Sequence, residues 1–171
     1  MKCQIYIQSR KALHQSSRWG DWVVHDMGDG RVTSPFQIIE MTNKSYVLDN
    51  GECFYFSDTE ELYRKWTIED AKDGDVLCTY ECDKPKIVFV LKGIPKKPYV
   101  LSYYCYYNIM YPYFESNSKT GCLAPNEEDV KPATIEQHEL LFRKMKEEGY
   151  QWDKNKKGNN KVIKEEDYDK R

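Results

Sequence analysis

The chain has 171 residues, and its 40% hydrophobic and 14% aromatic content is enough to form the core of one large domain or two small ones. Its 26 basic and 28 acidic side chains give a formal net charge of -2, which disfavours general attraction to a nucleic acid backbone. No apolar run is long enough to form a signal peptide or to span a membrane. Because the six cysteines are also dispersed, we expect a cytoplasmic protein with reduced thiols and no membrane association.

Strand and turn signals define a first β-rich module at residues 20–66, which follows an N-terminal strand and a polar link at residues 1–19. A turn at Gly20-Asp21 precedes the first strand of the module, and the turn residues 27–30 end it. Further strands separated by turns are expected at residues 36–41, 45–48 and 53–56. A meander of such short strands is expected to curl into an SH3-like barrel or half-barrel, because open sheet edges are costly.

A capping pattern after this meander predicts a short helix. Ser57 suits the N-cap position and Glu60 the third helical position, and the helix would carry Leu62, Tyr63 and Trp66. A second β-rich module is expected at residues 67–133. It would begin with a helical turn and continue with strands at residues 76–80, 87–91 and 103–107.

The two modules share a residue pattern. Gly20-Asp21 recurs as Gly74-Asp75, and Tyr46-Val47-Leu48 recurs at nearly the same spacing as Tyr99-Val100-Leu101. We therefore predict a mainly β (α+β) fold made of two SH3-like β-meander half-repeats, each followed by a capped helix, with a C-terminal hairpin. The alternative interpretation is a chance likeness between two ordinary β meanders.

The clearest helix signal of the chain opens the C-terminal region, residues 134–163. Thr134 as N-cap and Gln137 at the third position form a capping box, and Gly149 is suited to end the helix. Leu141, Phe142 and Met145 form an apolar stripe that we expect to pack on a sheet.

A final hairpin is expected after this helix. Its strands are predicted at residues 150–152 and 161–163, joined by a polar turn at 154–160. The charged residues 164–171 then form a tail that we expect to fray.

Two strings of the sequence carry a resemblance. The first is WTIEDAKDGDVL, residues 66–77, and the second joins KPAT, LLF, KMKE, GY and WD between residues 131 and 153. Together they resemble signatures of uncharacterised small proteins encoded by phages and integrated elements of gut anaerobes. The resemblance implies a mobile-element origin and a modular β-rich fold, with no catalytic residues to carry over. Because small accessory proteins of phages often bind host proteins or signalling nucleotides, it also suggests counter-defence.

Several polar residues suggest an active site or a metal site, but each also has a structural interpretation. Cys78 and Cys82 bracket three residues, yet zinc needs four converging ligands and the sequence has no second closely spaced Cys or His pair. His25, Asp26 and Asp29 match an acid–base or metal cluster, but they also lie in an expected hairpin turn. We expect structural thiols and a turn here, with no metal and no cofactor.

The segment from Tyr99 to Phe114 contains eight aromatic residues, more than the alternation of one strand buries on a single face. Outward-facing tyrosines suit stacking on bases or packing against a protein, and nearby lysines suit contact with phosphate. The alternative is that the tyrosines cover a thin sheet and the closing helix. The predicted ligand-binding residues are Tyr103, Tyr104, Tyr106, Tyr107, Tyr111, Lys96 and Lys97.

The sequence as a whole favours binding over catalysis. The leading hypothesis is a mobile-element accessory protein that presents the tyrosine segment to a host protein or to a nucleotide-like ligand. The first alternative is a nucleic-acid-binding β-barrel module, which the net charge disfavours. The second is a small hydrolase or nuclease centred on His25, Asp26 and Asp29.

Overall fold

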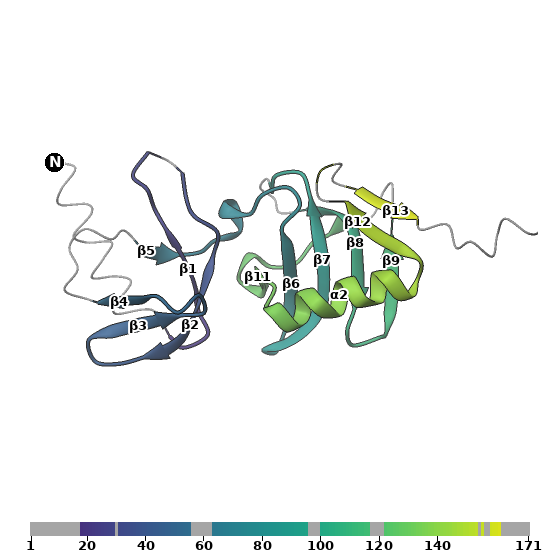
Figure 1. Cartoon of the computed structure of the whole chain (residues 1–171). Helices are drawn as coiled ribbons and strands as arrows, with labels where there is room; N and C mark the ends of the chain where they lie inside the picture. The colour runs from purple at the N-terminus through teal and green to yellow at the C-terminus, as the bar shows by residue number, and fades with distance from the viewer. Residues whose placement is uncertain are drawn as a thin grey trace, which may run out of the picture. The chain divides into compact units, whose positions relative to one another are not determined.

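The computed structural model describes residues 18–29, 31–55, 63–95, 100–116, 122–153, 155 and 158–161 (Figure 1). Within these residues the fold is mainly β, with antiparallel sheets and one α-helix. The chain divides into two compact units, Met1–Asp70 and Ala71–Arg171. The division falls at Asp70, whereas the sequence patterns start the second module at residue 67.

The first unit contains a five-stranded antiparallel sheet in the order β4-β3-β2-β1-β5. One face of this sheet buries Val23, Ile38, Tyr46, Leu48, Phe54 and Tyr63 together. These side chains come from all five strands, and Tyr46 and Leu48 share the face because they are two residues apart on β3. The elements are β1 (Trp22–His25), β2 (Phe36–Met41), β3 (Ser45–Leu48), β4 (Cys53–Tyr55), β5 (Tyr63–Lys65) and the 3-10 helix η1 (Ile68–Asp70).

The second unit contains a six-stranded antiparallel sheet in the order β10-β8-β7-β6-β11, with β9 also paired to β8. A separate two-stranded sheet, β12-β13, follows the helix. The elements are β6 (Val76–Glu81), β7 (Lys84–Lys92), β8 (Leu101–Asn108), β9 (Tyr113–Ser116), β10 (Cys122–Leu123), the 3-10 helix η2 (Glu127–Asp129), β11 (Val130–Pro132), α2 (Ile135–Glu147), β12 (Tyr150–Asp153) and β13 (Gly158–Lys161).

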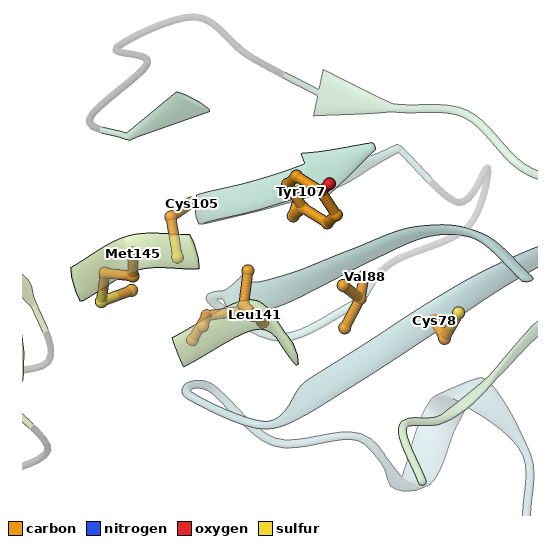
Figure 2. Packing of buried hydrophobic residues seen from close by; sticks show 7 residues of the cluster. Cys78, Val88, Cys105, Tyr107, Leu141 and Met145 are labelled. Atoms are coloured by element: carbon orange, nitrogen blue, oxygen red, sulfur yellow. The ribbon is translucent and has the colours of Figure 1, made fainter. Parts of the chain in front are cut away.

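Helix α2 lies across one face of β6, β7 and β8 (Figure 1). Leu141 and Met145 are fully buried and point from the helix onto the sheet, where they meet Val88, Cys105 and Tyr107 (Figure 2). Burial of a leucine or methionine side chain of this size stabilises a fold by about 1.5–3 kcal/mol. The predicted apolar stripe is therefore the surface that holds α2 in place.

Both predicted ends of α2 are confirmed. Thr134 is the N-cap, its hydroxyl accepts from the Gln137 N–H, and the Gln137 side chain accepts from the Thr134 N–H, which completes the capping box. At the other end Gly149 has φ +80°, a left-handed conformation that costs glycine little. This turn reverses the chain and starts β12 beside the helix.

The turn before β1 is held by a compact set of hydrogen bonds. The Gly20 N–H donates to the Ile38 carbonyl at 2.8 Å, and the Ile38 N–H donates back to the Asp21 carbonyl at 2.9 Å. The Asp21 carboxylate accepts from the Arg18 N–H at 2.7 Å. Gly20 has φ +86°, a backbone conformation that favours glycine.

The turn before β6 repeats this pattern. The Gly74 N–H donates to the Leu91 carbonyl at 2.9 Å, and the Leu91 N–H donates to the Asp75 carbonyl at 2.8 Å. The Asp75 carboxylate accepts from the Lys72 N–H at 2.7 Å, and Gly74 has φ +94°. The two Gly-Asp pairs noted in the sequence therefore form turns of the same hydrogen-bonding type.

The helix predicted after the first meander is wrong where the structure describes it. Residues 56–62, with Ser57 and Glu60, lie outside the described residues, but Tyr63–Lys65 form strand β5 and pair with β1. Tyr63 is buried, and its ring lies 4.9 Å from that of Phe54. Long-range strand pairing and burial therefore outweigh the local helix signal at Tyr63.

The C-terminal hairpin forms with a shorter turn than predicted. Strand β13 begins at Gly158, within the expected turn, and Asp153 pairs with Gly158. The Asp153 carboxylate accepts from the Asn155 N–H at 3.0 Å, which tightens the turn at its start. The predicted N-terminal strand, residues 162 and 163 of the final strand, and the tail lie outside the described residues.

Replacing Gly74 by alanine should lower the free energy of unfolding by about 1–2 kcal/mol, because a Cβ is unfavourable at positive φ. A steric clash does not contribute to this loss of stability, since a Cβ at position 74 would approach no heavy atom more closely than 3.9 Å. Gly74→Asn should cost less, because asparagine tolerates left-handed backbone. Urea denaturation of the three proteins checks this, and equal stability of wild type and Gly74→Ala would contradict it.

Candidate functional site

The tyrosine segment is split between two faces of the sheet by an irregularity in β8. Val90 of β7 pairs with Cys105, but Leu91 pairs with Tyr103, so Tyr104 is an extra residue without a partner on β7. Cys105 and Tyr107 consequently pack under α2, with Tyr104 beside them. Tyr103 lies on the other face together with Tyr106. The ring centroids of these two tyrosines are 5.0 Å apart.

The predicted ligand-binding residues therefore do not form one surface. Tyr103 and Tyr107 are only 5% and 8% exposed, so their rings belong to the interior. Tyr104 and Tyr106 are half-buried on opposite faces, and Tyr111 in the β8–β9 turn is 72% exposed. Lys96 and Lys97 lie outside the described residues. Strand alternation together with the bulge is the physical reason for this division.

A cleft opens beside the C-terminal half of α2, where β12 and the start of β6 face it. Its volume is about 940 Å³. Aromatic and apolar side chains supply most of its wall, with polar groups at its rim. The lining residues are Gly74, Asp75, Val76, His138, Phe142, Met145, Lys146, Gly149, Tyr150, Gln151 and Trp152.

Tyr104 supports the cleft from behind Trp152. The two ring centroids lie 5.3 Å apart with a tilt of 57°. The Tyr104 hydroxyl donates to the Asp73 carboxylate at 3.1 Å, and the Gly93 N–H donates to the same oxygen at 2.7 Å. Lys92 Nζ lies 5.6 Å from the centre of the Tyr104 ring. These contacts hold the Tyr104 ring in place, and Tyr104 in turn supports Trp152 in the wall of the cleft.

The ionisable side chains at the cleft differ in the interactions that they already make within the protein. Asp75 accepts from the Lys72 N–H and so belongs to the turn before β6. The His138 ring lies 4.7 Å from that of Phe142, one helical turn further along α2. Lys146 is exposed, and within the described residues its ammonium group forms no ion pair. The cleft therefore combines aromatic walls with the Lys146 cation and with the Asp75 carboxylate, which is held in the turn.

The residues of the hydrolase hypothesis are engaged in local structure. Asp26 accepts from the Gly28 N–H at 2.9 Å and lies 3.6 Å from Arg64. Asp29 forms an ion pair with Arg31 at 2.6 Å, and the hydrogen bonds from Arg31 lower the pKa of this carboxyl. The His25 ring instead stacks on Tyr63, 5.1 Å between centroids.

His25 also lines a cavity that neither aspartate reaches. This cavity of about 410 Å³ is bounded by His25, Thr33, Phe36, Glu52, Cys53 and Tyr63. The structure thus separates the imidazole from the two carboxylates with which the sequence groups it.

The cysteines considered as metal ligands do not converge. Cys78 is buried under α2, whereas Cys82 is exposed in the β6–β7 turn at φ 50°. Burial raises the pKa of the Cys78 thiol to about 12, so it stays protonated at neutral pH. Among the residues that the structure describes, no group of three or more His, Cys, Asp or Glu side chains is placed to hold a metal ion.

The cleft was missed by sequence reasoning, although two signals for it exist. His138, Phe142 and Lys146 are spaced four residues apart and so lie along one face of α2. The strings at residues 66–77 and 131–153 also meet here, since Gly74 comes from the first and Phe142 and Trp152 from the second. What the sequence alone does not provide is the packing that brings them together.

Comparison of the chain with protein-family models, with curated proteins and with solved structures gives no match. In the described part of the chain no helix has both the length and the apolar character needed to cross a membrane. The site therefore has to be interpreted from its own geometry.

The thiols of this structure should react in two groups. Cys53, Cys82 and Cys122 are exposed and should be alkylated rapidly by iodoacetamide in the folded protein. Cys78 and Cys105 are buried and should react only on unfolding. Peptide mass spectrometry after timed labelling measures each rate, and rapid labelling of Cys105 in the folded protein would contradict its burial.

Proposed function

We propose that this chain is a binding protein that holds a planar, nucleotide-like ligand in the cleft beside α2. The observation that carries the proposal is the cleft itself. Its volume of about 940 Å³ is of the size that small-molecule sites occupy, roughly 300–1,000 Å³. Such sites are mostly apolar with a few polar groups that orient the ligand, and this lining has that composition.

The aromatic walls support a planar ring as the ligand. Phe142 comes from α2, while Tyr150 and Trp152 come from β12, so the rings stand on two elements that border the same space. Stacking of a nucleobase on an aromatic side chain contributes about 1–3 kcal/mol. The hydrogen bond from Tyr104 to Asp73 also supports the proposal, because it restrains the Tyr104 ring that contacts Trp152.

Lys146 supports a negative group on that ligand. Its ammonium group is the lining cation that has no partner within the described residues, and the Asp75 carboxylate is held by the Lys72 N–H. A phosphate at the rim would gain a charge-assisted hydrogen bond from Lys146. A ring between aromatic side chains and a phosphate at the rim is the arrangement of a nucleotide.

The biological setting is proposed on other grounds. A mobile-element origin, a host protein as partner and a role in counter-defence rest on the resemblance of the two strings, and so does a place in the host cytosol. The convergence of both strings on the cleft supports a common role for them. Sequestering a signalling nucleotide would join the two parts of the proposal.

We also propose that the two sheets are half-repeats of one SH3-like meander. In both sheets the first strand of the meander also pairs with the last strand of that sheet. The strand orders are β4-β3-β2-β1-β5 and β10-β8-β7-β6-β11. The matching turns at Gly20-Asp21 and Gly74-Asp75 support the same interpretation. A nucleic-acid-binding barrel remains the alternative function on this fold, and a steep loss of affinity with salt would identify it.

The binding proposal is tested by titrating the full chain with the 5′-monophosphates of adenosine, guanosine, cytidine and uridine. We expect at least one to shift the indole N–H resonance of Trp152 with saturation. Lys146→Met should weaken that ligand about tenfold, or about 1.4 kcal/mol, through loss of the charge. Trp152→Ala should remove measurable binding.

Lys84→Met is the matched control, because it removes the same charge from an exposed position in β7 outside the cleft. It should leave the affinity within twofold of wild type. Saturating shifts that Lys146→Met and Trp152→Ala leave unchanged would move the site elsewhere. No shift with any of the four nucleotides at millimolar concentration would contradict the nucleotide proposal.

A further inference from the structure

The β8–β9 hairpin carries a second group of aromatic side chains, on the sheet face opposite α2. It consists of Tyr103, Tyr106, Tyr113 and Glu115, here named the tyrosine–glutamate cluster. Tyr106 pairs directly with Glu115 across the hairpin, so both side chains project from the same face. Tyr113 is two residues from Glu115 along β9 and shares that face.

The rings of the cluster meet edge to face. Tyr103 and Tyr106 are 5.0 Å apart with planes at 78°, and Tyr106 and Tyr113 are 6.2 Å apart with planes at 62°. Exposure rises across the cluster, from 5% at Tyr103 to 56% at Tyr113. The result is a corner of near-perpendicular rings whose base is buried and whose outer wall faces solvent.

Glu115 places a negative charge in this corner. Its two carboxylate oxygens accept one hydrogen bond each, from the Tyr103 and Tyr106 hydroxyls, both at 3.3 Å. Neither donor carries a charge, and within the described residues no lysine or arginine forms an ion pair with Glu115. Burial, followed by the charge of Glu115, raises the pKa of Tyr106 to about 12, so the Tyr106 hydroxyl remains a donor at neutral pH.

The chain itself shows that a cation suits such rings. On the α2 side, lysines lie over the rings of Tyr104, Tyr80 and Tyr107 at 5.6, 5.0 and 5.9 Å. In the described part of the chain no cation lies over Tyr106 or Tyr113. These two rings and the Glu115 carboxylate therefore combine the π faces and the charge that attract an organic cation.

We propose that the tyrosine–glutamate cluster receives a cationic side chain of a protein partner, an arginine guanidinium or a lysine ammonium, methylated or not. Met110 and Tyr111, 45% and 72% exposed in the turn of the same hairpin, add apolar area for the residues that flank this side chain. The inference is independent of the nucleotide proposal, because the cluster lies on the opposite face of the sheet from α2 and shares no residue with the cleft.

The test uses pairs of probes that differ in charge and little in shape. Choline is compared with 3,3-dimethyl-1-butanol, its neutral isostere, and arginine amide with citrulline amide. We expect the cationic member of at least one pair to shift the ring resonances of Tyr106 and Tyr113 in the full chain, with saturation in the millimolar range. The neutral members should bind at least fivefold more weakly, because only the cation gains from the carboxylate and the ring faces.

Substitutions separate the charge from the rings. Glu115→Gln removes the charge and keeps one of the two acceptor oxygens, and it should weaken the cationic probe about tenfold. Tyr113→Leu removes an exposed ring and should weaken it about threefold or more. Tyr55→Leu is the matched control, since Tyr55 is an exposed tyrosine of β4 in the first unit and belongs to neither the cluster nor the hairpin, and it should leave the affinity within twofold.

Equal shifts from choline and its neutral isostere, and from both amides, would overturn the proposal, because the contact would then be apolar only. Unchanged affinity in both Glu115→Gln and Tyr113→Leu would overturn it as well. If Glu115→Gln lowers the melting temperature, the exposed Tyr113→Leu variant still decides the outcome. The choice between choline and arginine amide distinguishes a quaternary ammonium from a guanidinium, and neither result depends on nucleotide binding.

Discussion

The single unpaired residue in β8 is the constraint on which both candidate sites depend. Because Tyr104 has no partner on β7, the chain changes face between Tyr103 and Cys105. In a regular strand Tyr103 would share the α2 side with Cys105 and Tyr107, and Tyr104 would turn away from Trp152. The irregularity therefore places Tyr104 against Trp152 at the cleft, and it places Tyr103 where its hydroxyl donates to Glu115. A bulge at such a position is typical of strands that direct side chains into sites.

The cleft follows from how α2 is held. Leu141 and Met145 fix the helix on β7 and β8, and Gly149 turns the chain so that β12 returns alongside it. Phe142 is next to Leu141 in sequence but lies to the side of the buried stripe, where it borders open space. When the apolar stripe of a helix is wider than the area that the sheet covers, the side chains at the edge of the stripe stay partly exposed. The cleft is thus the uncovered edge of the same stripe that stabilises the unit.

Local sequence signals predicted the strands at Phe36–Met41 and Ser45–Leu48 and the capped helix from Thr134, because turn and cap residues act over a few positions. They failed where distant pairing decides, as at Tyr63, which joins β1 instead of a helix. The tyrosine segment shows the same limit. Its aromatic content was visible, but its division between two faces depends on the register against β7, which no local pattern encodes.

The two proposed sites have opposite chemistry on opposite faces of one sheet. Lys146 gives the cleft a positive charge beside Trp152, whereas Glu115 gives the tyrosine–glutamate cluster a negative charge beside Tyr106. On these proposals, Lys146 would contact an anionic group at the cleft, and Glu115 would contact a cationic side chain at the cluster. Since β8 is hydrogen-bonded to β7 along one edge and to β9 and β10 along the other, it is held in a single register. Because coupling between sites requires an element with two arrangements, this pairing of β8 supports two proposed sites that act separately.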